Sequence, residues 1–179
     1  MKFFSLIAFI IVLHLPATAQ KRLTPVDAKS KVEFSIRNIG IPTHGTLSGL
    51  SGVIQIHESA IERSSVNVTV AVSTINTDNS RRDKHLRHAD FFEVEKYPVI
   101  RIQSSSISRG EKAGQYIFNG NLTIKSTTQP IRFPFEAIKL GKEYIFKGSF
   151  KIDRLDFGVG ESSATLSDEV QVMLEIHAE

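Results

Sequence analysis

The chain contains no cysteine and no tryptophan among its 179 residues. Without cysteine it cannot form disulfides, a thiolate metal site or a cysteine nucleophile, and it cannot carry the lipidated N-terminal cysteine of a bacterial lipoprotein. After Ala19 no apolar run approaches the roughly 20 residues that a membrane-spanning helix needs. The domain must therefore be stabilised by its hydrophobic core, for which the sequence supplies 12 phenylalanines.

Neither sign of charge is in large excess. The sequence has 22 lysines and arginines against 19 acidic residues, a formal net charge of +3. This balance argues against a polyanionic partner, and no array of stacking aromatics accompanies the one basic cluster. We therefore expect no nucleic-acid binding.

Residues 1–19 have the pattern of a secretory signal peptide. Lys2 gives a positive start, residues 3–15 are largely apolar, and Ala17-Thr18-Ala19 is a small-residue cleavage signature. A membrane anchor is the alternative, but the run is shorter than the roughly 20 residues needed to span. We expect cleavage near Ala19-Gln20, which leaves residues 20–179 as one exported domain, periplasmic or secreted.

From Ser30 onward, apolar and polar side chains alternate in short runs, as in half-buried strands. The most regular run places Val66, Val68, Val70 and Val72 on one face. About eight such runs, mostly with short connections, predict an all-β fold, either a closed antiparallel barrel or a sandwich.

The interior of such a barrel is either packed or holds one slender ligand. Gly120 and Gly148 lie at inward positions that a packed core would fill, and large inward aromatics cluster on adjacent strands, which favours a cavity. Glycines and bulky rings would equally suit the taper of a filled barrel. The pattern alone does not decide between a filled interior and one that holds a ligand.

In residues 79–98 the spacing of the apolar residues changes from every second residue to every third. Leu86, Ala89 and Phe92 recur every three residues, which predicts one amphipathic helix over about Ser80–Phe92. Its start has a capping-box-like pair, Ser80 and Asp83, and competing caps in Asp78 and Asn79. Proline at position 98 prevents its continuation. The apolar residues Leu86, Phe91 and Phe92 are expected to close one end of the barrel.

The same stretch is crowded with positive charge, at Arg81, Arg82, Lys84, His85, Arg87 and His88. Docking on anionic lipid is one interpretation. A solvated helix face, with Arg82 and Asp83 paired to neighbouring loops, is the other and the one we favour. His85, His88 and Asp90 have a spacing that permits metal binding, but the surrounding cations oppose it, so we expect no metal site.

No catalytic arrangement can be identified. No serine lies in a G-x-S-x-G motif, and no carboxylate pair can be assigned to one site. Asp153, Arg154 and Asp156 are interpreted as a structural ion pair and turn. We expect a protein that is not an enzyme.

Four segments, in the same order, resemble the YceI-like family of bacterial exported proteins. The resemblance runs from about Ser30 to the C-terminus and rests on SRRDKHLRHADFFEVEKYPVIRI, NGNLTIKSTTQPI, IDRLDFGVG and the final strand with Asp168-Glu169-Val170. It implies an eight-stranded antiparallel lipocalin-like barrel that binds a polyisoprenoid or another lipid in its lumen. Asn38 and Ser126 depart from the residues usual in that family, histidine and glycine.

The resemblance and the inward positions together predict lipid contacts at Phe34, Ile36, Phe118, Leu122, Phe133, Phe135, Phe146 and Phe150. For each residue alone, a role in the structural core is the alternative. The expected ligand is a polyisoprenoid, an isoprenoid quinone or a fatty-acid derivative, and no other cofactor is expected.

Three functions follow from these observations. The first is an exported protein that holds a long-chain amphiphile for transport, storage or sequestration. The alternative is an envelope interaction or stress protein with a filled barrel, acting through its basic helix and loops. A hydrolase or isomerase acting on a lipid has the least support. Transient contact with a membrane surface and a homodimer are both left open.

Overall fold

The computed structural model describes residues 20–179, so the predicted signal peptide lies outside the described residues. These residues form nine strands, one α-helix and three short 3₁₀ turns. In chain order the strands and the helix are β1 (Lys21–Leu23), β2 (Lys31–Asn38), β3 (Ile41–Ile56), β4 (Ser65–Asn76), α1 (Ser80–Leu86), β5 (Val99–Arg109), β6 (Gln115–Ile124), β7 (Thr127–Leu140), β8 (Glu143–Asp153) and β9 (Leu166–Ala178). The 3₁₀ turns span Asp27–Lys29, Ile61–Arg63 and Leu155–Phe157.

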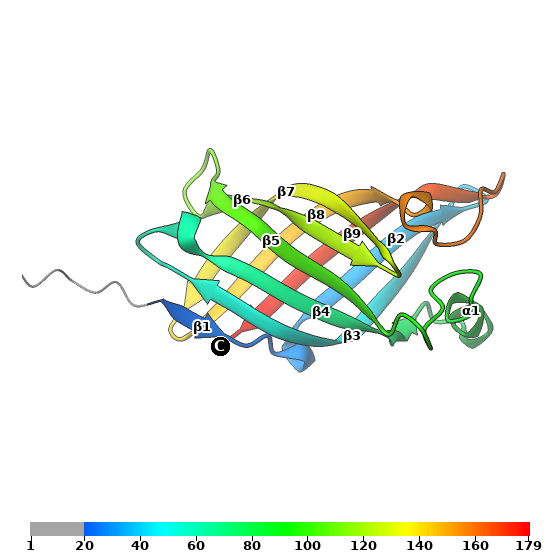
Figure 1. The fold of residues 1–179 in the computed structure, drawn as a ribbon, viewed down its shortest axis with the longest axis horizontal. Helices are drawn as coiled ribbons and strands as arrows, with labels where there is room; N and C mark the ends of the chain where they lie inside the picture. The colour runs from blue at the N-terminus through cyan, green and yellow to red at the C-terminus, as the bar shows by residue number, and fades with distance from the viewer. Residues whose placement is uncertain (1–19) are drawn as a thin grey trace, which may run out of the picture.

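The strands form one antiparallel sheet in the order β1-β3-β2-β9-β8-β7-β6-β5-β4. Pairing of β3 with β4 joins the two sides of this sheet, so β2 to β9 form a closed eight-stranded barrel (Figure 1). The predicted antiparallel barrel is therefore confirmed. Closure leaves these strands without the open edges that would pair with other chains.

The ninth strand, β1, lies before Ser30, where the alternation that predicted the other strands begins. It pairs with Ile54–Ile56 of β3, beyond the stretch of β3 that pairs with β2. Thr24 and Glu179 then exchange two backbone hydrogen bonds of 2.7 and 3.1 Å, which tie this segment to the end of β9. The chain's first strand thus continues the barrel wall between β3 and β9.

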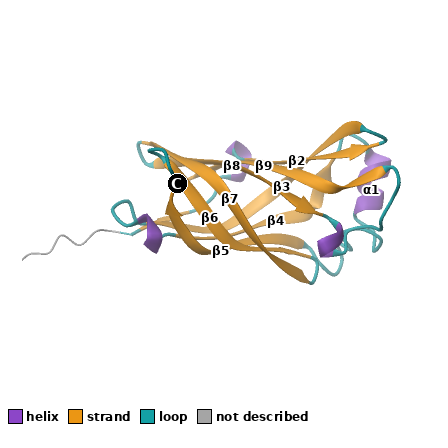
Figure 2. Ribbon diagram, turned by 90° about the horizontal axis from the view of Figure 1, so that it is seen from above, coloured by secondary structure: helices purple, strands orange, loops and turns teal. Residues whose placement is uncertain are grey.

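The two ends of the barrel differ. The β2–β3 turn, α1 and the Leu155–Phe157 turn lie at one end, which we call the helix end (Figure 1). The β3–β4, β5–β6 and β7–β8 connections and the C-terminus lie at the other, which we call the far end. Figure 2 shows α1 beyond the strand ends, where it covers part of the helix end.

The helix is shorter than predicted, since it ends at Leu86 instead of Phe92. Asn79 is its N-cap and accepts a 3.0 Å hydrogen bond from the Arg82 amide. Beyond Leu86 the chain continues in tight turns, in which the amide of Phe92 bonds the carbonyl oxygen of Leu86. These turns also repeat roughly every three residues, so the apolar spacing that predicted a longer helix fits them equally well.

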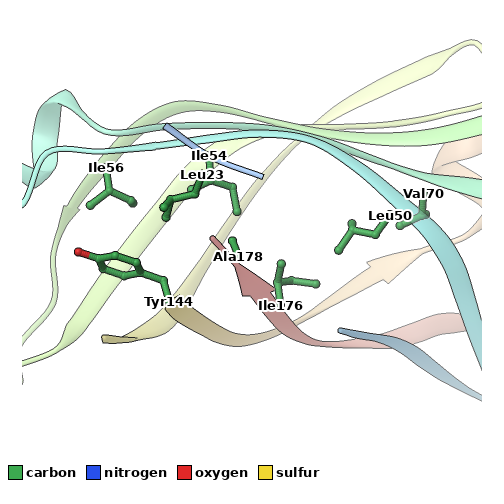
Figure 3. Close-up of a cluster of buried hydrophobic side chains, with 8 residues drawn as sticks. All are labelled: Leu23, Leu50, Ile54, Ile56, Val70, Tyr144, Ile176 and Ala178. Atoms are coloured by element: carbon green, nitrogen blue, oxygen red, sulfur yellow. The ribbon is translucent and has the colours of Figure 1, made fainter. Parts of the chain in front are cut away.

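The far end is closed by a cluster of buried apolar side chains from five strands, β1, β3, β4, β8 and β9 (Figure 3). Its members are Leu23, Leu50, Ile54, Ile56, Val70, Tyr144, Ile176 and Ala178. Alternation explains this cluster, because every second residue of β3, β4 and β9 points inward. The outer face is polar, and there Lys147 of β8 lies opposite Glu175 of β9 at 2.9 Å.

In the described part of the chain, no helix has the length and apolar character needed to cross a membrane.

A candidate lipid-binding cavity

A cavity of about 320 Å³ occupies the barrel between the helix end and the far-end cluster. Its floor is formed by Leu50, Val70 and Ile176, which also belong to that cluster. Residues of β3, β6 and β8 form part of its wall, and the larger part comes from inward positions of β2, β4, β5 and β9. The wall residues of these four strands are Val32, Phe34, Ile36, Val68, Ile100, Ile102, Val170, Val172 and Leu174.

These wall side chains point into the barrel but are only partly buried. By contrast, Ile107, Phe118 and Phe133, which also point inward, are buried. The difference shows that the interior is packed along one part of the barrel and hollow along another. An apolar space of this size falls within the range of about 300–1,000 Å³ typical of small-molecule sites.

The structure divides the eight predicted contact residues into two groups. Phe34, Ile36, Leu122 and Phe150 line the cavity. The others belong to the packed interior, where Phe118, Phe133 and Phe135 join one buried cluster and Phe146 packs against the far-end cluster. Lipid contact by the first group stays a prediction, whereas the second group does not reach the cavity.

One wall of the barrel is a stack of aromatic rings on adjacent strands. Phe118 of β6 stacks on Phe133 of β7 at 4.9 Å between ring centroids, and Phe133 stacks on Phe150 of β8 at 4.7 Å. Phe150 is the member that reaches the cavity. The stack therefore separates the filled side of the barrel from the hollow side.

The inward glycines do not line the cavity. A Cβ atom at Gly120 would lie 2.6 Å from the Phe118 ring, and one at Gly148 would lie 3.0 Å from the Phe133 ring. Both positions instead make room for the stacked rings. The prediction that these glycines open a cavity is therefore wrong, and on this side of the barrel they accommodate the rings of a filled interior.

Polar side chains concentrate where the cavity meets the helix end. Arg82 donates to the Thr77 hydroxyl at 2.7 Å and to the Thr77 carbonyl oxygen at 2.6 Å. The buried carboxylate of Asp83 accepts from the amide and the hydroxyl of Thr77. Arg82 and Asp83 thus fasten α1 to the end of β4, as the solvated-face interpretation expected.

Arg82 and His85 border two spaces at once, since both line the cavity and both line a shallow hollow on the outer side of α1. Leu86, Phe91 and Phe92 line the cavity from the same side. The predicted barrel-end residues therefore do meet the lumen, although the last two do so from turns and not from the helix. This side is the mouth of the cavity.

A second arginine, Arg154, also lines the cavity and organises the chain beside the turns that follow α1. Arg154 is 4% exposed and donates to the carbonyl oxygens of Ser167, Val159 and Glu161. It also forms a 2.8 Å ion pair with Asp168. The sequence suggested an ion pair among Asp153, Arg154 and Asp156, but the carboxylate that pairs with Arg154 comes from β9. Arg154 thereby fixes the chain between β8 and β9 beside the cavity.

A YceI-like domain model matches residues 23–178 of the chain. The chain belongs to the YceI-like domain family. Among similar proteins, a UPF0312 protein from Photorhabdus laumondii is 30% identical over 153 residues, which cover 81% of this chain and 78% of that protein.

Two solved structures share the fold of this YceI-like domain. The crystal structure of Burkholderia cenocepacia BcnA has a TM-score of 0.81 at 24% identity, covering 87% of this chain and 99% of that one. A polyisoprenoid binding domain from Saccharophagus degradans has a TM-score of 0.70 at 14% identity, covering 88% and 97%. At these identities the likeness shows the fold alone.

Most of the cavity wall of this YceI-like domain is aliphatic and was not singled out from the sequence. Val68, Ile102 and Val172 line the cavity, whereas most of the predicted lipid contacts are phenylalanines. The signal was present, because period-two alternation places each of them inward. What alternation cannot supply is which inward residues face empty space.

Metal ligands are not gathered at the mouth. His85 Nε2 lies 3.6 Å from Asp90, which makes a pair and not a coordination shell. Within residues 20–179 no group of three or more His, Cys, Asp or Glu side chains could hold a metal ion.

Proposed function

We propose that this YceI-like domain is an exported binding protein that holds a long-chain amphiphile in its cavity, for transport, storage or sequestration. The observation that carries the proposal is the cavity of about 320 Å³ with walls of aliphatic and aromatic side chains. Burying apolar ligand surface there gains roughly 25 cal/mol per Å², which suffices for firm retention of a long chain. The amphiphile's polar head would lie at the mouth, beside Thr77, Arg82 and His85.

Two further observations support this assignment. The Saccharophagus degradans protein of the same fold is described as a polyisoprenoid binding domain. The sequence of residues 1–19 supports export to the periplasm or beyond the cell. A polyisoprenoid, an isoprenoid quinone and a fatty-acid derivative each combine a long apolar chain with a small polar head. Binding without turnover is proposed, since the mouth residues Arg82, Asp83 and Arg154 are engaged in structural hydrogen bonds.

The first experiment is mass spectrometry of an organic extract of the protein, purified without detergent from a bacterial periplasm. A stoichiometric long-chain species is expected. The matched pair of variants is Val68→Phe, which fills the cavity from β4, and Asn67→Phe, which adds the same ring to the exposed outer face of that strand.

The extract of V68F should lose the ligand, while N67F should keep it and both should remain folded. An empty wild-type extract, together with no uptake of added quinone or fatty acid, would refute a binding function. The cavity would then be an unused space, and the basic residues around α1 would become the place to seek a protein partner.

A further inference from the structure

The tip of the β2–β3 hairpin exposes two large apolar side chains. Ile39 is 74% exposed and Ile41 is 68% exposed, the two highest values among the large hydrophobic residues of residues 20–179. The β2–β3 turn that carries them lies at the helix end (Figure 1), where Asn38 and Thr43 line the cavity. Two exposed isoleucines at one loop tip are a costly surface in water and point to an apolar partner.

The backbone at this tip is strained. Ile39 has φ of 53° and Gly40 has φ of 75°, as in the two-residue hairpin turns whose central residues both have positive φ. Asn-Gly is the usual pair there, because asparagine tolerates that conformation and a β-branched residue does not. The Ile39 amide still bonds the Thr165 carbonyl oxygen at 2.7 Å, so the turn is held in place. A strained backbone conformation at an exposed isoleucine does not stabilise the fold, which points to a functional role for this side chain.

The hairpin continues the cavity wall past the barrel rim. Asn38 lies opposite Ile41, and Ile36 lies opposite Thr43, in an unbroken register. Ile36, Asn38 and Thr43 all line the cavity. Because side chains two residues apart share a face of a strand, Ile41 extends this same face beyond the mouth.

The other side of the mouth carries positive charge. In α1, Arg81 and Lys84 are exposed, while the only acidic residue of that helix, Asp83, is buried. The mouth thus has an apolar tip on one side and exposed cations on the other. These suit a surface with an apolar interior beneath an anionic outer layer. An anionic lipid bilayer has that arrangement.

We propose that the helix end docks on an anionic membrane surface, with Ile39 and Ile41 inserted among the acyl chains and with Arg81 and Lys84 on the lipid headgroups. This inference rests on the proposed function, because a ligand with a long apolar chain leaves a bilayer most readily into an opening that touches it. Docking places the mouth at the lipid surface, so that the ligand avoids bulk water.

The test is co-sedimentation of the full protein with vesicles of phosphatidylethanolamine and phosphatidylglycerol, against vesicles of phosphatidylcholine alone. Binding to the anionic vesicles is expected, and it should weaken with salt. The double variant I39N/I41T should lower the affinity about tenfold or more, since each isoleucine loses its apolar burial. R81Q/K84Q should remove the preference for anionic vesicles.

The matched control is Leu140→Asn, which removes an exposed apolar side chain, 55% exposed, from the far end. It should leave vesicle binding unchanged. Equal binding by the wild type, I39N/I41T and L140N would overturn the inference. So would a wild-type dimer that I39N/I41T converts to monomers without any vesicle binding, because a second copy would then cover the tip. Either result, with a lipid still found in the organic extract, would leave the binding function standing.

Discussion

The ring of Phe34 lies directly over Gly45, its partner on the neighbouring strand. A Cβ atom at Gly45 would come within 2.3 Å of Phe34 Cζ and within 2.9 Å of Thr77 Cγ2. The glycine lets the ring lie back against the barrel wall, where it lines the cavity. The volume of the cavity therefore depends on one missing methyl group.

Gly45→Ala is accordingly expected to push the Phe34 ring into the lumen. We predict weaker retention of the ligand and a loss of about 1–3 kcal/mol in the free energy of unfolding, as for other overpacked cores. Urea unfolding and the lipid content of the purified protein measure the two effects. In G45A/F34L the ring is gone, so both should recover. If the double variant retains the full defect, the ring is not the cause.

Ile39→Asn is expected to stabilise the protein. A left-handed conformation costs roughly 1–2 kcal/mol for an ordinary residue, and asparagine relieves part of that cost. Little packing is lost, because the side chain is 74% exposed. Urea unfolding should show a gain of about 1 kcal/mol over the wild type. A loss of stability would mean that the isoleucine makes contacts which outweigh its backbone strain.

Arg154→Met is expected to destabilise the protein by roughly 3 kcal/mol, because three carbonyl oxygens and Asp168 lose a buried donor. Lys151→Met is the matched control. Lys151 also pairs with a carboxylate of β9, Glu169, at 2.8 Å, but both partners are largely exposed. Its loss should cost about 1 kcal/mol or less. Similar costs for the two variants in urea unfolding would contradict this account.

Glu58 should make the stability of the far end sensitive to acid. The hydrogen bond from Lys21, with those from Tyr144 and Lys139, lowers the pKa of Glu58 from 4.5 to about 2. A folded-state pKa below the unfolded one stabilises the protein above pH 4.5, and this contribution is lost as the pH falls from 4.5 towards 2.

Glu58→Gln removes that titration, so its thermal unfolding temperature should fall less steeply over this interval than that of the wild type. Glu136→Gln, at an exposed carboxylate outside the ion pairs described for residues 20–179, should keep the wild-type slope. Parallel curves for E58Q and the wild type would show that Glu58 does not carry the acid dependence.

Much of this architecture could be predicted from the sequence, because alternation along one strand is a local property. The valines from Val66 to Val72 and the runs around Phe118 and Phe150 lie in strands where the pattern placed them. The boundary at Leu86 could not be predicted, since turns and a helix satisfy the same apolar spacing. The carboxylate that pairs with Arg154 comes from another strand, and local pattern does not identify such a partner.

The extent of the cavity could not be read from the sequence for a similar reason. Whether an inward side chain meets a ring or an empty space depends on the residues across the barrel. Phe118 is buried because Phe133 and Gly120 lie where they do, and Val172 is partly accessible because the residues facing it leave room. The sequence gives the size of each side chain, but it does not show which side chain faces it across the barrel.

The pair of backbone hydrogen bonds between Thr24 and Glu179 has a consequence for the order of folding. The seam that it completes joins the first strand to the last, and β9 also separates β2 from β8. A growing chain cannot assemble this wall before β9 has been synthesised, because β2 and β8 would each lack a partner. Closure is therefore delayed until the last strand has been made, and a chain truncated before β9 is expected to show no cooperative unfolding transition.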